Sequence, residues 1–85
     1  MNENTIYSEP KRDVVVIDLD ARNLEPPHPL IKTLEVLATL PEGAALRLRT
    51  RWRPAHLYAE LEKRGFVGQS EEQTDGSYFT YIRRG

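Results

Sequence analysis

The chain has 85 residues, enough for a single domain whose core must hold together without disulfides. Hydrophobic residues make up 39% and charged residues 29% of the sequence, a composition typical of a globular domain. The absence of cysteine excludes disulfides, thiolate metal sites and thiol nucleophiles, and a net charge of −1 gives no general attraction to nucleic acid or acidic membranes.

Residues 1–12 show no hydrophobic period and end in Pro10-Lys11-Arg12, which predicts a flexible N-terminal arm in front of a domain at 13–85. The sequence contains neither the apolar core of a signal peptide nor an apolar stretch of membrane-spanning length. We therefore expect a cytoplasmic protein that has no membrane partner.

The first predicted strand is the apolar, β-branched run at 14–19, which we expect to be buried over much of its surface. Asp18 and Asp20 close this strand. Acidic residues in a strand-to-helix loop commonly form turns or caps, so these two do not predict a catalytic pair.

A helix is predicted to begin near Pro29, because proline is tolerated in a first helical turn, where its missing N–H would be unpaired anyway. The helix should end at Pro41-Glu42-Gly43. Its expected apolar stripe consists of Leu30, Ile31, Leu34, Leu37 and Ala38.

Residues 45–51 alternate in polarity, which predicts a strand with one buried face and one exposed face. The inward set is Leu46, Leu48 and Thr50, and the outward set is Arg47, Arg49 and Arg51. A second helix is predicted at 54–64, with Pro54 in its first turn, with Leu57, Tyr58 and Leu61 facing inward, and with Gly65 as its stop.

The rest of the chain predicts two strands, at 66–73 and 78–83, joined by a hairpin turn at Asp75-Gly76. If Ile82 faces the core, alternation places Phe79, Tyr81 and Arg83 on the opposite face. The order βαβαββ predicts the α/β (α+β) class, a two-layer sandwich in which a four-stranded mixed sheet carries two helices on one face.

The strand-to-helix junction Leu24-Glu25-Pro26-Pro27-His28-Pro29-Leu30 resembles the Cys-Pro-x-Pro turn of the TusA/SirA family of small sulfur-carrier proteins. The turn Leu40-Pro41-Glu42-Gly43 and the segment from Asp75 to Arg84 are also similar to parts of that family, so the likeness spans about the last seventy residues. The resemblance implies the same βαβαββ fold.

The position of the family's reactive cysteine is occupied by Pro26. A persulfide carrier needs a thiolate, so this chain is not expected to carry sulfur. It more closely resembles a cysteine-free, uncharacterised branch of TusA-like domains, some of which are fused to hemerythrin-like domains and carry a similar Pro-Pro…His-Pro-Leu junction.

One edge of the predicted sheet should carry a basic rim, because parallel strand–helix units start their helices beyond the carboxyl ends of the strands, where open α/β sheets bind ligands. The expected rim residues are Arg51, Trp52, Arg53, His56 and His28, with Arg22 as an addition. An anion or an acidic partner would complement such a rim. The alternatives are a solvated basic edge and, for Trp52, a core residue that ends the strand.

The open face of the sheet offers a second candidate surface, formed by Arg47, Arg49, Phe79 and Tyr81. Arginines interleaved with aromatic rings could stack RNA bases, form cation–π pairs among themselves, or make a homodimer contact. The chain has no glycine-rich RNA-binding signature, so nucleic acid is the least favoured of these partners.

The functional hypothesis is a non-catalytic binding or adaptor module with a protein partner and no cofactor, either a monomer or a weak homodimer. No nucleophile elbow or phosphate-binding loop is present, and we expect no enzymatic activity. The alternative is a sensing domain for a small ligand, metal or haem, with His28 as a candidate ligand. A lone histidine without a second ligand at helical spacing is weak support for a metal site.

Overall fold

The structure is a computed structural model and describes residues 14–85, so the predicted arm at 1–12 lies outside the described residues. The elements are β2 (Val16–Asp20), α1 (His28–Ala38), β3 (Ala45–Thr50), α2 (Leu57–Lys63), β4 (Phe66–Glu72) and β5 (Tyr78–Arg84). This is the predicted order βαβαββ, and each predicted element is present.

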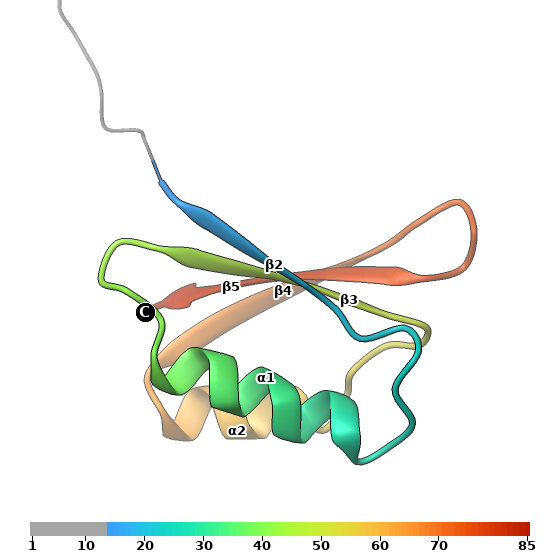
Figure 1. Ribbon diagram of the computed structural model, residues 1–85, viewed down its shortest axis with the longest axis horizontal. Coiled ribbons are helices and arrows are strands. Elements are labelled where there is room, and N and C mark those ends of the chain that lie inside the picture. The colour runs from blue at the N-terminus through green and yellow to red at the C-terminus, as the bar shows by residue number, and fades with distance from the viewer. Residues whose placement is uncertain (1–13) are drawn as a thin grey trace, which may run out of the picture.

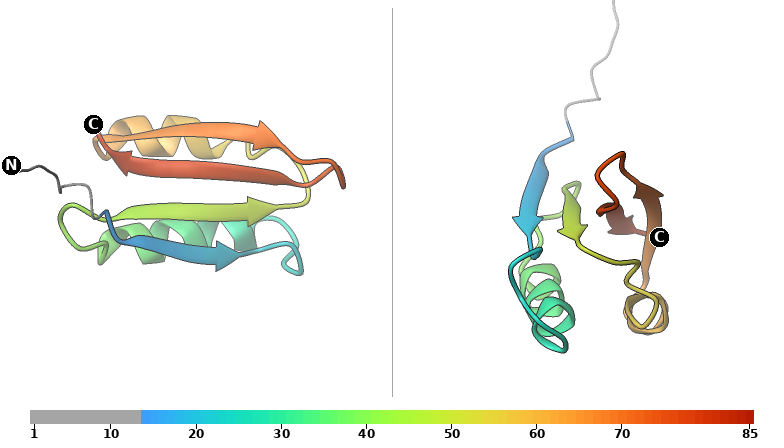
Figure 2. Two further views of the ribbon diagram at one scale, coloured as in Figure 1. Left: turned by 90° about the horizontal axis from the view of Figure 1, so that it is seen from above. Right: turned by 90° about the vertical axis from the view of Figure 1, so that its right-hand side faces the viewer.

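The four strands form one mixed sheet in the order β2-β3-β5-β4 (Figure 1). Strand β2 pairs with β3 in parallel, and β5 pairs antiparallel with both β3 and β4. Both helices lie on the same face of this sheet, as the end-on view in Figure 2 shows, and the other face is open. The predicted two-layer sandwich is therefore confirmed.

Strand β2 is less buried than the apolar run predicted. The strand begins two residues later than predicted, so Val14 and Val15 precede it. These two residues and Val16 are 54, 62 and 49% exposed, and within the run only Ile17 and Leu19 pack against the core. The prediction of a largely buried strand was wrong because β2 is an edge strand, bonded within the sheet to β3 alone. A run of β-branched residues suits an edge strand as well as a central one.

Helix α1 buries a stripe that is rotated from the predicted one. Thr33 and Leu37 are its buried residues, whereas Ile31 is 47% exposed and Ala38 is also exposed. Leu30 and Leu34 are partly buried against the core, as expected. Thr33 is accommodated because its hydroxyl donates a hydrogen bond to the carbonyl of Pro29 at 2.7 Å, four residues earlier.

Strand β3 has the predicted facing, with Leu46, Leu48 and Thr50 buried under the helices. Ile82 of β5 is fully buried opposite Leu46, which settles the facing of β5 as predicted. The arginines of β3 consequently lie on the open face of the sheet, because side chains alternate along a strand.

Helix α2 packs closely on β4. Leu61 is buried on the inner side of the helix, and a Cβ atom added to Gly68 of β4 would lie 2.7 Å from Leu61 Cδ1. Such an approach leaves no room for a side chain at position 68. The helix begins three residues later than predicted, since residues 54–56 form a turn in which the N–H of Leu57 donates to the carbonyl of Pro54 at 3.1 Å.

The hairpin between β4 and β5 forms at Asp75-Gly76, as predicted. Gly76 has a φ of +84°, a left-handed conformation that favours glycine. The Asp75 carboxylate accepts hydrogen bonds from the hydroxyl of Ser77 at 2.6 Å and from its N–H at 2.9 Å. These hydrogen bonds lower the pKa of Asp75. Across residues 14–85, no helix combines the length and apolar character that crossing a membrane requires.

Candidate functional site

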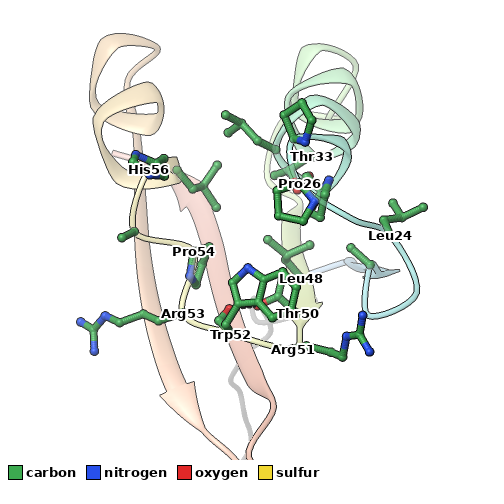
Figure 3. A pocket seen from close by; sticks show the side chains of 16 residues that line it. Leu24, Pro26, Thr33, Leu48, Thr50, Arg51, Trp52, Arg53, Pro54 and His56 are labelled. Carbon is green, nitrogen blue, oxygen red and sulfur yellow. Dashed lines mark hydrogen bonds between the residues drawn. The ribbon is translucent and has the colours of Figure 1, made fainter.

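A pocket of about 460 Å³ lies between the first turns of the two helices, beyond the carboxyl ends of β2 and β3 (Figure 3). We call the floor the four buried lining residues Ala21, Thr33, Leu48 and Thr50. One wall comes from the junction before α1 and the other from the turn before α2. This is the sheet edge at which the sequence predicts a binding rim.

The wall on the α1 side is rich in proline. It consists of Leu24, Pro26, Pro27, Pro29 and Leu30. The prolines supply no N–H, and two of the other early donors are used within the turn. The N–H of His28 donates to the carbonyl of Glu25 at 2.8 Å, and that of Ile31 donates to the carbonyl of Pro27 at 3.1 Å. With few free backbone donors, the start of α1 is poorly suited to bind an anion through its backbone.

The floor of the pocket has two hydroxyl groups, and both are already engaged. Thr50 donates to the carbonyl of Trp52 at 2.6 Å, and Thr33 donates to the carbonyl of Pro29 at 2.7 Å. Each hydroxyl proton is therefore committed to the protein, and no charged side chain belongs to the floor. The interior favours an apolar occupant because a charge placed there would lose its hydration without gaining a partner.

The mouth of the pocket is basic and aromatic. Trp52 is 47% exposed, which does not fit the alternative that it ends β3 as a core residue. The guanidinium of Arg51 lies 5.4 Å from the centre of the Trp52 ring. In Figure 3 the Arg51 and Arg53 side chains extend to opposite sides of Trp52, and neither forms an ion pair with an acid among residues 14–85.

The structure brings together four of the five predicted rim residues. Arg51, Trp52, Arg53 and His56 line the pocket, and His56 belongs to the wall on the α2 side with Pro54, Ala55 and Leu57. His28 does not line it, although Pro27 and Pro29 on either side of it do. His28 instead lies exposed at the start of α1.

Arg22 is also not part of the pocket, because Asp20 holds it. Its Nε and Nη2 atoms donate to the two Asp20 carboxylate oxygens at 2.9 and 2.7 Å. The hydrogen bond from the Arg22 side chain is the largest cause that lowers the pKa of Asp20 to about 2. Arg22 therefore stabilises the loop after β2 and is not available to a ligand in the pocket.

Sequence reasoning missed the apolar lining. Leu24, Thr33 and Ala55 carry no signal of their own, and the predicted rim was basic, with no apolar lining assigned to it. The available signal was proline at the start of both helices, with Pro26, Pro27 and Pro29 facing Pro54 across the pocket. Rings with fixed backbone conformation form rigid, non-polar walls.

The two arginines of the open face already have acidic and aromatic partners within the chain. Arg47 Nε lies 2.5 Å from Asp18 Oδ1, and Arg49 Nη2 lies 3.1 Å from Asp75 Oδ2. The Asp18 hydrogen bond raises the pKa of Arg47. The two guanidinium groups lie 5.2 and 4.6 Å from the centre of the Phe79 ring, so this ring is already in contact with cations. Tyr81, which is 43% exposed, is the open-face aromatic most accessible to a ligand.

Within residues 14–85 no group of three histidine, cysteine, aspartate or glutamate side chains is arranged to hold a metal ion. The two histidines are on different helix starts, and only His56 lines the pocket.

Comparison with known proteins identifies one family. Residues 18–84 match the family described as an uncharacterized conserved protein (DUF2249). The chain belongs to the DUF2249 family. The match includes β3, both helices and the two C-terminal strands, so both walls of the pocket are part of the DUF2249 domain. A search of curated proteins gave no match to the chain.

Proposed function

We propose that this DUF2249 domain is a non-catalytic binding module that engages a protein partner through the rim formed by Arg51, Trp52, Arg53 and His56. One observation carries the proposal: an apolar pocket opens between an exposed tryptophan and two arginines without acidic partners among the described residues. Tryptophan and arginine dominate the binding energy of protein interfaces, particularly around an apolar pocket. The proposal also places the module in the cytoplasm, a compartment with which a chain without cysteine is compatible.

The proposal includes descent from a TusA-like sulfur carrier. Pro26, which stands where the resemblance to the TusA family places the reactive cysteine, lines the pocket. A partner that docked near that cysteine would keep the same docking surface after the thiol was lost. Exchange of cysteine for proline would then have removed the sulfur chemistry and retained recognition.

Affinity capture followed by mass spectrometry tests the proposal. The bait is the wild-type chain, compared with the double variant Arg51→Glu/Arg53→Glu. A matched control, Lys32→Glu/Arg83→Glu, makes the same change in net charge at two exposed positions away from the pocket. We expect the wild type and the control to retain a partner that the rim variant loses, with all three folded by circular dichroism. Capture of the same partner by the folded rim variant would refute the proposal.

A second candidate function, binding of a small ligand, is favoured by the size of the pocket. A volume of about 460 Å³ lies within the range of roughly 300–1,000 Å³ that is usual for small-molecule sites. This candidate depends on the pocket and not on His28, which lies outside the lining. A ligand that is retained through purification and lost in a pocket-filling variant would favour it over the protein partner.

A further inference from the structure

The pocket and its mouth differ in chemistry, and this difference indicates what kind of partner fits. The interior is uncharged, with the hydroxyls of Thr33 and Thr50 both donated to backbone carbonyls. The proline rings on both sides hold this shape without help from a ligand. A preformed cavity of this kind suits an apolar group, because little of the protein must be ordered on binding.

Among the described residues that line the pocket, the arginines lie at its mouth, one on each side of the opening. Arg51 and Arg53 lie on either side of Trp52, with their side chains extending away from the cavity in opposite directions (Figure 3). A compact organic anion would reach one guanidinium or the other while its apolar part occupied the pocket. An occupant with acidic groups on both sides of its apolar group would meet both arginines.

We propose that the pocket receives a single apolar side chain from a partner protein, within an extended segment that carries acidic residues on both sides of it. This inference rests on the proposed function and specifies the partner: an acidic peptide segment with one leucine-like anchor. The anchor occupies the part of the cavity beside Trp52, and the flanking carboxylates pair with Arg51 and Arg53. Such pairs at an exposed rim mainly increase the rate of association and its sensitivity to salt.

Synthetic peptides test the inference on the full chain. Three acetylated and amidated peptides have a leucine between two glutamates, with zero, one or two glycines as spacers on each side. Two matched controls replace the leucine by glycine or both glutamates by glutamine, and octanoate represents a small amphipathic anion. Binding is measured by isothermal titration calorimetry and followed by tryptophan emission, which reports only on Trp52 because it is the single tryptophan of the chain.

We expect at least one leucine–glutamate peptide to bind more tightly than both control peptides and octanoate, with an affinity that falls as salt is added. Arg51→Gln and Arg53→Gln should each weaken it by about two- to five-fold, the usual size of an exposed ion pair. Ala55→Phe, which adds a ring at an exposed residue of the pocket lining, should abolish binding. Ala59→Phe, on an exposed part of α2 outside the lining, should not.

Several results would overturn the inference. Equal binding of the glycine control would mean that charge alone is recognised, and equal binding of the glutamine control would mean that the arginines play no part. Tighter binding of octanoate would assign the pocket to a small ligand. If no peptide binds while the rim variant still loses its captured partner, this inference fails and the proposed function stands. If that variant also keeps its partner, both fail.

Discussion

The close contact between α2 and β4 makes a quantitative prediction about how the two layers are held together. A Cβ atom at Gly68 would lie 2.7 Å from Leu61 Cδ1, well short of ordinary van der Waals contact, and Leu61 is only 1% exposed. Gly68→Ala should therefore destabilise the domain by about 1–3 kcal/mol through overpacking. Leu61→Ala should cost about 2–5 kcal/mol through loss of buried contacts and creation of a cavity.

The two substitutions should compensate each other, because the methyl group added at position 68 enters the space that the truncated leucine leaves. We measure a double-mutant cycle by urea denaturation. The loss of unfolding free energy in the double variant should be smaller than the sum of the two single losses by at least about 1 kcal/mol. Leu61→Val in place of Leu61→Ala keeps the cycle measurable if the alanine variant does not fold. Additive effects, or a neutral Gly68→Ala, would refute this packing of α2 on β4.

Two further predictions concern the loop after β2 and the proline junction. Because the pKa of Asp20 is lowered to about 2, its ion pair should stabilise the fold above about pH 4 and lose its effect as the pH falls toward 2. We expect this contribution to the free energy of unfolding to be below about 1 kcal/mol, because the pair is exposed. Asp20→Asn should remove its pH dependence, and the control Glu42→Gln should preserve it. The second prediction is tested by intact mass after incubation with a cysteine desulfurase and its substrate. The wild type should gain no sulfur, and Pro26→Cys should gain one sulfur atom. A sulfur adduct on the wild type would contradict the exclusion of carrier chemistry.

Most of the fold was predictable because its signals are local. The alternation at 45–51 determines which face of β3 is buried, and the proline and glycine residues determine where the helices end and the hairpin turns. The pairing of strands in the sheet is not a local property, and the same apolar run is compatible with an edge strand and with a central one. The exposure of Val14, Val15 and Val16 was missed for this reason.

The candidate site was only partly predictable for a related reason. The topology brought Arg51, Trp52, Arg53 and His56 to one edge, since helix starts and strand ends meet there. It did not determine the rotation of α1 about its own axis, on which the burial of Thr33 and the exclusion of His28 from the pocket both depend. A shift of one residue along a helix turns a side chain by about 100°, so a small error in the start of a helix changes its lining residues.

Chemical-shift mapping tests the central claim most directly. The wild-type chain, labelled with nitrogen-15, is titrated with the partner recovered by affinity capture, and changes are followed at every backbone amide. We expect the largest changes at residues 51–57 and along the junction at 24–30, with the Trp52 indole signal among them. Changes concentrated instead at Arg47, Arg49, Phe79 and Tyr81, with the pocket residues unaffected, would contradict the claim and identify the open face of the sheet as the interface.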